Sequence, residues 1–188
     1  MAREAWFHSG WTSVRTRVDD PRCHQELLTG FIRLWTHWGL PDYILCVGTD
    51  RATGDAFGPL VGSRLMEWGS LPSKVLGSLD APLHAGNLTA LLKARPYLQH
   101  ARCLAVDASL GLPEEVGAIA LGVGAIRPGA GVRKDLPPIG RYFVTATVNI
   151  GGFMDSYVLQ NTRLGLVMRM ADAVARALAL SLRVDQAP

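Results

Sequence analysis

Residues 43–62 read YILCVGTDRATGDAFGPLVG, an apolar run followed by a polar loop and a second apolar stretch. The first part, residues 43–48, is short, continuous and rich in aliphatic side chains, which is typical of a strand buried on both faces. The polar loop covers residues 49–57, and Gly58 and Pro59 then mark the start of a helix. The stretch therefore predicts a strand, a long loop and a helix in succession, the basic unit of an α/β protein.

The rest of the chain repeats this alternation of strand and helix patterns. Helical spacing of apolar residues occurs in residues 23–38, 85–97 and 162–182, and buried-strand patterns occur in residues 74–79, 103–106, 116–126 and 142–150. We expect an α/β fold, a three-layer αβα sandwich with a mostly parallel sheet, phosphorylase/hydrolase-like. Residues 1–21 show no sustained period and are predicted to form an N-terminal arm, which leaves residues 22–188 as a single α/β domain.

Composition and charge narrow the functional class. The chain has 188 residues, 48% of them hydrophobic and 19% charged, which is typical of a globular protein that needs no disulfide to hold its core. The longest segment without Asp, Glu, Lys or Arg, residues 142–154, is too short to span a bilayer, and residues 1–10 lack the apolar core of a secretory signal. The net charge is only +3 and the arginines are scattered. We expect a cytoplasmic protein with reduced core cysteines and with no membrane or nucleic-acid partner.

Two aspartates follow predicted strands at the edge where α/β proteins bind ligands. Asp55 lies in the loop after residues 43–48, and Asp107 directly follows residues 103–106. The ligand crevice of an open α/β sheet forms outside the carboxyl ends of its strands, so the two carboxyl groups converge if their strands are neighbours. Such a pair can share one proton and activate a water against a peptide carbonyl, and it can also hold a divalent metal. Helix capping by Asp55 and turn hydrogen bonding by Asp107 are the structural alternatives.

Signatures of several other enzyme classes are absent from the sequence. The loop after Gly48 lacks the second glycine of a dinucleotide fingerprint, and no Gly-Lys-Ser or Gly-Lys-Thr follows it. Ser109 is preceded two residues earlier by Asp107 and not by glycine, so there is no serine-hydrolase elbow. No His, Cys or carboxylate residues show zinc-ligand spacing. We therefore expect no cofactor and no bound metal.

Further polar and glycine residues near element ends are candidates for substrate binding. They are Thr49, Asp50, His84, Asn87, Gly129, Gly131 and Asn149. His84 follows the second predicted strand and enters a helix, so it can share the crevice with the aspartates; a capping or surface role is the alternative. The turn around Gly129 and Gly131 follows a strand, and its N–H groups can line a substrate or an oxyanion; a plain connecting turn is the alternative.

Several stretches together resemble a known protein family. They are CVGTDRATGDAFGPLVG at residues 46–62, PLHAGNL at 82–88, AVDASLG at 105–111, PGAGV at 128–132 and VLQNTR at 158–163. These stretches are similar to the YyaC family of sporulation proteins, relatives of the germination protease of endospore-forming bacteria. By motif, the resemblance places the proposed catalytic aspartates of the germination protease on Asp55 and Asp107.

More distantly, the chain resembles the hydrogenase maturation peptidases, which have the same fold class and a similar acidic pair. Those enzymes add a histidine in a later segment to bind a metal. In this chain no histidine follows Asp107, because the last one is His100. The resemblance therefore does not carry a metal site over to this sequence.

The family resemblance implies a peptidase that hydrolyses a spore protein through the aspartate pair. Small acid-soluble spore proteins are the implied substrates, and the mother cell or forespore of an endospore-forming bacterium is the implied compartment. The alternative is a non-catalytic module of sporulation that binds a peptide or protein with the same fold. A metal-dependent peptidase is a third interpretation, and a homo-oligomer stays open.

Overall fold

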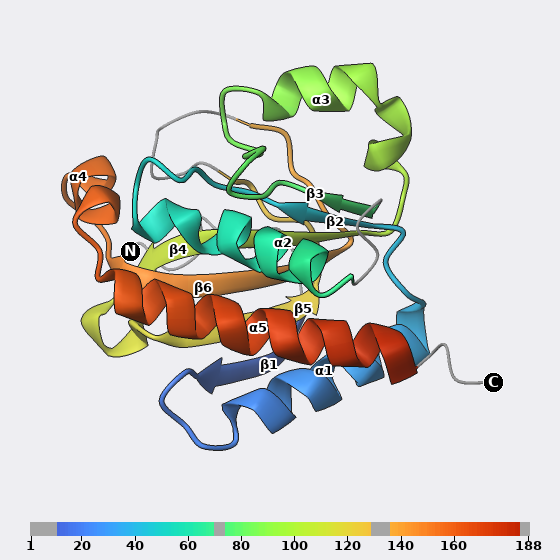
Figure 1. Cartoon of the computed structure of the whole chain (residues 1–188), viewed down its shortest axis with the longest axis horizontal. Coiled ribbons are helices and arrows are strands. Elements are labelled where there is room, and N and C mark those ends of the chain that lie inside the picture. Colours follow the sequence, from blue (N-terminus) through green and yellow to red (C-terminus); the bar gives the residue numbers. More distant parts are fainter. Residues whose placement is uncertain (1–10, 70–73, 129–135, 185–188) are drawn as a thin grey trace.

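In the residues that the structure describes, 11–69, 74–128 and 136–184, the computed structural model folds into a six-stranded sheet flanked by helices (Figure 1). The strands are β1 (Trp11–Arg17), β2 (Tyr43–Cys46), β3 (Val75–Leu76), β4 (Cys103–Gly111), β5 (Ala118–Val123) and β6 (Tyr142–Ile150). The α-helices are α1 (Cys23–Trp38), α2 (Phe57–Glu67), α3 (Leu88–Ala94), α4 (Asp155–Gln160) and α5 (Leu164–Val184). Short 3-10 helices are η1 (Gly54–Ala56), η3 (Pro96–Gln99) and η4 (Pro113–Glu115).

Strand order and direction confirm the predicted α/β class with a mostly parallel sheet. The order is β1-β5-β6-β4-β2-β3. Strands β3, β2, β4 and β6 are parallel neighbours, whereas β5 runs antiparallel to both β6 and β1. Because parallel pairs need crossover connections, the chain returns through α2 between β2 and β3, and through α3 between β3 and β4. The carboxyl ends of β2, β4 and β6 therefore meet at one edge of the sheet.

Consecutive residues of the central strands enter two separate cores. Ile44 and Cys46 pack with residues of α1, α2 and α5, whereas Leu45 and Val47 pack with residues of α3 on the opposite face. Figure 1 shows α2 and α5 side by side, with α3 well apart from them at the top of the view. Burial on both faces is what the continuous apolar run predicted. The three cysteines are buried free thiols, also as predicted.

The structure corrects the predicted N-terminal arm, because residues 11–17 form the edge strand β1, which pairs with β5. Thr16 is buried and Val14 packs against the core below α1, whereas Arg15 and Arg17 are exposed. This alternation contains a single aliphatic side chain, and the register with β5 shifts between Thr12 and Val14. An alternation this weak does not distinguish a strand from a loop in the sequence. Residues 1–10 lie outside the described residues.

The predicted helices are present, some of them with different ends. α1 and α5 lie where helical spacing predicted them. α3 is shorter than the predicted helix over residues 85–97, because Pro96 lacks the N–H that helix hydrogen bonding needs and draws Arg95 out of helical geometry. α4 lies in a segment for which the sequence predicted no element. In the described ranges, each helix is either too short or too polar to serve as a transmembrane span.

Candidate active site

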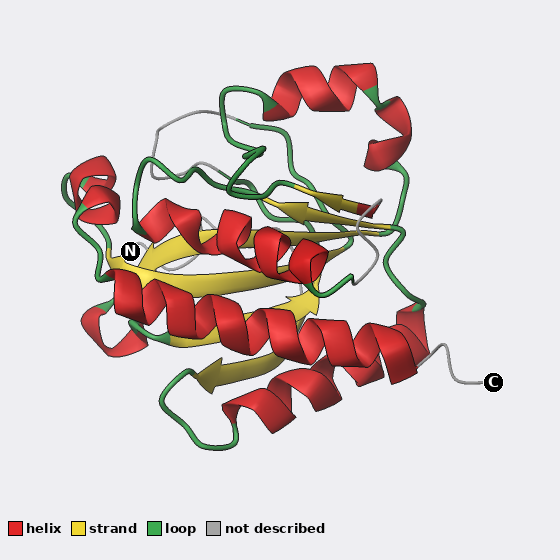
Figure 2. Ribbon diagram, in the orientation of Figure 1, coloured by secondary structure: helices red, strands yellow, loops and turns green. Residues whose placement is uncertain are grey.

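The connection from β2 to α2 folds back and holds Asp55 beside the end of β2. Gly48 has a φ of +139°, and a Cβ atom there would collide with the carbonyl oxygen of Asp55. Gly58 lies equally close to the carbonyl oxygen of Val47. The amide of Thr49 donates a hydrogen bond of 3.2 Å to the carbonyl oxygen of Asp55. Because only glycine permits both close approaches, these glycines determine where Asp55 lies. In Figure 2 this loop lies at the same edge of the sheet as α4.

Asp107 lies within β4, not beyond its end as the sequence suggested. Hydrogen bonding with β6 continues to Gly111, and Asp107 is in register with Thr145. Since neighbouring Val106 belongs to the core under α2 and α5, strand alternation puts Asp107 on the opposite face, the one that α3 covers. Its side chain is only 5% exposed, and one carboxyl oxygen accepts a hydrogen bond of 2.9 Å from the amide of Ala108.

The two carboxyl groups lie close enough to influence each other. Burial raises the pKa of Asp107 well above its ordinary value, and the negative charge of Asp55 raises it further. Burial also raises the pKa of Asp55, while a hydrogen bond from the backbone of Thr49 and the charge of His84 lower it. Burial and like charge therefore favour the protonated form of Asp107 more strongly than that of Asp55.

The loop that carries His84 is fixed to the end of β2. Leu83 bridges Val47, and the carbonyl of Leu83 accepts a hydrogen bond of 2.8 Å from the amide of Gly48. The imidazole of His84 is half-buried, and its Nδ1 atom accepts a hydrogen bond of 3.0 Å from the amide of Gly86. In the neutral ring the proton therefore resides on Nε2. The structure thus brings His84 close enough to Asp55 for its charge to lower the pKa of that carboxyl group.

The other predicted binding residues divide into groups with different surroundings. Thr49 is half-buried beside Asp55, whereas Asp50 is exposed and its carboxylate accepts a hydrogen bond of 3.4 Å from the Thr49 hydroxyl. Asn87 supports the His84 loop: its Oδ1 accepts from the His84 amide at 2.8 Å and its Nδ2 donates to a carbonyl in the same loop at 2.9 Å. Its side chain is thus engaged in holding the loop.

Asn149 likewise holds a connection. Its Nδ2 donates a hydrogen bond of 3.1 Å to the Thr162 hydroxyl, and its Oδ1 accepts one of 2.9 Å from the amide of Ile150. These bonds join the end of β6 to the segment between α4 and α5. Gly129 and Gly131, the predicted oxyanion turn, lie outside the described residues.

A row of hydroxyl groups extends from Asp107 along the same face and was not predicted. Ser109 and Thr147 are in register on β4 and β6, and their hydroxyl oxygens lie 3.3 Å apart. Thr145 is the partner of Asp107 in the same strand pair. The signal was present in the sequence as polar residues at every second position of both strands. These residues are recognised as one row only once the register of β4 with β6 is known.

The described residues do not assemble a metal site around the aspartates. Among them, no group of three or more His, Cys, Asp or Glu side chains is arranged to hold a metal ion. Within the same ranges, neither Asp55 nor Asp107 forms a salt bridge with an arginine or lysine. Within these residues, the like charges of the pair are therefore not offset by an arginine or a lysine.

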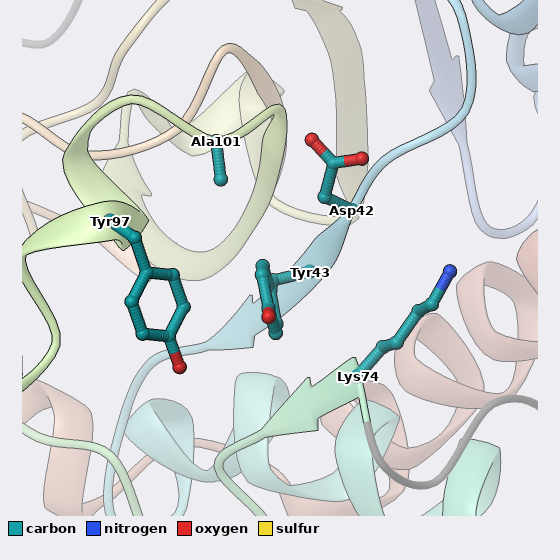
Figure 3. Close-up of a pocket in the computed structure, with 5 residues that line it drawn as sticks. All are labelled: Asp42, Tyr43, Lys74, Tyr97 and Ala101. Carbon is teal, nitrogen blue, oxygen red and sulfur yellow. The ribbon is translucent and has the colours of Figure 1, made fainter.

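A surface hollow of about 610 Å³ lies at the opposite edge of the sheet (Figure 3). It is lined by Asp42, Tyr43, Lys74, Tyr97 and Ala101. Tyr43 begins β2, whereas Asp55 follows the end of that strand. Asp42 forms a salt bridge of 3.0 Å with Arg102, and the rings of Tyr43 and Tyr97 lie 5.6 Å apart. The hollow is therefore separate from the aspartate pair, and its acidic residue, Asp42, is already paired with Arg102.

The family described as "Protein of unknown function (DUF1256)" matches residues 15–177 of the chain. The chain belongs to this family. The DUF1256 chain is 44% identical over 148 residues to a protein of Bacillus subtilis (strain 168) described as "Uncharacterized protein YyaC". The matched region covers 78% of this chain and 72% of the relative. The resemblance to YyaC in the sequence motifs is thereby confirmed.

Among solved structures, the DUF1256 chain is similar to the crystal structure of a NiFe hydrogenase maturation protease, HycI, from Thermococcus kodakarensis KOD1. The TM-score is 0.50 at 18% sequence identity, and the match covers 81% of this chain and 97% of the other. At that identity the similarity shows the fold alone. The predicted α/β fold related to the maturation peptidases is therefore confirmed.

Proposed function

We propose that this DUF1256 protein is a peptidase that hydrolyses peptide bonds through Asp55 and Asp107. The observation that supports this is the pairing of a buried carboxyl group, Asp107, with a second carboxyl group close enough to raise its pKa. A pair that holds one proton supplies an acid and a base at the same place. The fold shared with a maturation protease is compatible with this activity.

In the proposed reaction Asp55 is the base and Asp107 the acid, because Asp107 is the more deeply buried of the two and His84 favours ionised Asp55. Asp55 takes a proton from a water molecule whose oxygen attacks the carbonyl carbon of the scissile bond, while Asp107 gives its proton to the carbonyl oxygen. Asp55 then protonates the leaving amine nitrogen as the C–N bond breaks. A hydroxyl proton of the intermediate returns to Asp107, so one water is consumed and the pair is restored.

The proposed substrate is a protein of the spore, and small acid-soluble spore proteins are the first to test. The support is the resemblance of the sequence motifs to the YyaC family of sporulation proteins and to the germination protease, of which the 44% identity bears out the YyaC part. The proposed compartment is accordingly the cytoplasm of an endospore-forming cell.

The test is to incubate the purified protein with small acid-soluble spore proteins over a series of pH values and to read cleavage by mass spectrometry. Asp55→Asn and Asp107→Asn are each expected to lower the rate at least about a thousandfold, because each removes one half of the acid and base pair. Asp80→Asn is the matched control, since Asp80 is an exposed aspartate that is not among the predicted site residues. Cleavage that survives in both pair variants would exclude the mechanism.

A second function, binding a peptide or protein without cleaving it, is favoured by one observation. Asp107 is only 5% exposed, so little of its carboxyl group is accessible to a substrate that must receive its proton. A folded protein that binds spore proteins but leaves them intact at every pH would support this second function over the first.

A further inference from the structure

Four large apolar side chains are exposed together at the end of β6 and the start of α4. They are Ile150 at 46%, Phe153 at 80%, Met154 at 58% and Tyr157 at 59% exposure. We refer to these four residues as the α4 patch. Residues 150–154 carry no charge, and Asp155, which follows, accepts a hydrogen bond of 2.9 Å from the amide of Gly152. Clustered apolar exposure of this kind marks interaction sites on soluble proteins.

The α4 patch includes the start of a helix that packs against the turn holding Asp55. α4 packs against η1, the turn that contains Asp55, and a Cβ atom added to Gly54 would meet Leu159 and Thr162 at 2.8–3.1 Å. The segment before α4 is joined to β4 through a hydrogen bond of 2.9 Å from the amide of Gly151 to the carbonyl of Gly111. Figure 1 shows α4 at the carboxyl edge of the sheet, beside the start of α2. A chain bound at the aspartates can therefore extend onto the α4 patch.

The backbone within the α4 patch adopts a conformation that costs free energy. Met154 has a φ of +51°, and no other non-glycine residue in the described part of the chain has a positive φ. Its carbonyl accepts hydrogen bonds from the amides of Tyr157 at 2.8 Å and Val158 at 3.0 Å, which hold it in place. Residues held in disfavoured backbone regions are concentrated at binding and catalytic sites.

We propose that the α4 patch binds an apolar segment of the polypeptide that is cut at the aspartate pair. This inference rests on the proposed peptidase function and adds to it a class of substrate, polypeptides with large apolar side chains a few residues from the scissile bond. The area favours a peptide over a second copy of the chain. At about 200 Å² for each fully exposed side chain, the four residues expose roughly 500 Å², whereas a stable dimer takes about 800 Å² from each partner.

The experiment separates binding from catalysis. A display library of random peptides is selected on immobilised Asp107→Asn protein, and the affinity of the selected peptides is then measured against Asp107→Asn proteins that also carry Phe153→Ser or Tyr157→Ser. We expect selected peptides rich in large apolar residues, and about tenfold weaker binding after either substitution, because each removes a contact typical of one buried side chain. Leu180→Ser is the matched control, since Leu180 is 43% exposed on α5, outside the α4 patch.

The outcomes distinguish the docking surface from the peptidase. Apolar selection that is lost in the Phe153→Ser and Tyr157→Ser proteins, but kept with Leu180→Ser, supports the docking surface even if the unmodified protein cuts none of the selected peptides. Absence of cleavage of the selected peptides would count against the proposed peptidase activity but not against the docking surface. Selection without apolar preference, or binding that the patch substitutions leave unchanged, overturns the inference. Self-association that disappears in Phe153→Ser, seen by sedimentation and without peptide selection, overturns it in favour of a second copy.

Discussion

The two faces of the central strands differ in what their side chains do. On one face, Val106, Val144 and Ala146 are fully buried against the helices α1, α2 and α5. On the other face, the intervening positions of the same two strands hold Asp107 and, opposite it, Thr145. The first face is continuous apolar packing. The second changes along the strands from the apolar core under α3 to a polar row at the carboxyl edge.

This difference shows how the two faces of the same strands serve different ends: one stabilises the fold, and the other holds a reactive carboxyl group. A buried carboxyl group with no cation beside it reduces stability, because burial and like charge both disfavour its ionised form. The face under α2 and α5 supplies the compensating burial, and its long helix α5 is fixed by the core residues Val167, Val174 and Leu178. The reactive carboxyl group therefore lies on the face with the smaller apolar core, where its cost to stability disturbs less packing.

The largest effect is expected from placing a charge on the packing face. Ala146→Asp puts a carboxyl group into a fully buried position with no partner, and we expect a loss of roughly 4 kcal/mol or more in the free energy of unfolding. Urea unfolding followed by circular dichroism measures it. The matched control is Thr147→Asp, one residue along the strand on the other face, where the side chain is half-buried. Equal losses in the two variants would contradict the difference between the faces.

A smaller loss is expected where the chain leaves β2 to form the loop with Asp55. Gly48→Ala places a Cβ atom against the carbonyl oxygen of Asp55 at a φ of +139°, so strain and collision together are expected to cost about 2–4 kcal/mol. Gly69→Ala separates the two causes, because Gly69 also has a positive φ, +66°, but nothing within 4 Å of an added Cβ. Its expected cost is about 1 kcal/mol. A destabilisation at Gly48 no larger than at Gly69 would show that the loop shifts to relieve the collision with the Asp55 carbonyl at little cost.

Much of the fold could be predicted because apolar runs and helical spacing are local signals. The strand over residues 43–48 and the helix over residues 23–38 lie within two residues of their predicted ends. β1 could not be predicted, because its inward side chains are one valine and one threonine. α4 could not be predicted either, since it is six residues long and starts at the positive φ of Met154.

The candidate site was predictable only in part. Asp55 and Asp107 follow apolar runs, so their place at the carboxyl edge could be expected from the sequence. The approach of His84 depends on the bridge between Leu83 and Val47, a long-range pairing that no local pattern specifies. That Asp107 lies inside its strand follows from the extent of pairing with β6, which the sequence also does not encode locally.

Removing the reactive carboxyl group is expected to increase stability. Because its pKa lies well above the ordinary 3.8, folded Asp107 keeps its proton over a range of pH in which the unfolded chain has released it. The free energy of unfolding therefore falls as pH rises from that value towards the raised pKa of the folded protein. Asp107→Asn removes this dependence, and at pH values above the raised pKa it is expected to add about 1.4 kcal/mol to the free energy of unfolding for each unit by which the pKa is raised.

Urea unfolding of Asp107→Asn and of the unmodified protein, at about pH 4 and about pH 8, measures this gain. The two proteins should be close in stability at the acid pH and diverge at the alkaline one. Asp50→Asn, in the exposed part of the loop, should show no such divergence. A variant that is less stable than the parent at both pH values would mean that Asp107 is ionised and stabilised by a partner.

The smallest effect on stability, and the most informative on the pair, is expected for His84→Gln. His84 is half-buried in a loop, so we expect a change below about 0.5 kcal/mol in the free energy of unfolding. The positive charge of His84 lowers the pKa of Asp55, so its loss should raise that pKa, which carbon NMR of the Asp55 carboxyl group measures without any substrate. If the protein is a peptidase, the acid limb of its rate profile should move to higher pH, because Asp55 must be ionised to act as base. His37→Gln, an exposed histidine on α1, should leave both measurements unchanged. An Asp55 pKa that does not move in His84→Gln would mean that the difference between the two carboxyl groups comes from burial and from the hydrogen bond of the Thr49 backbone, without a contribution from His84.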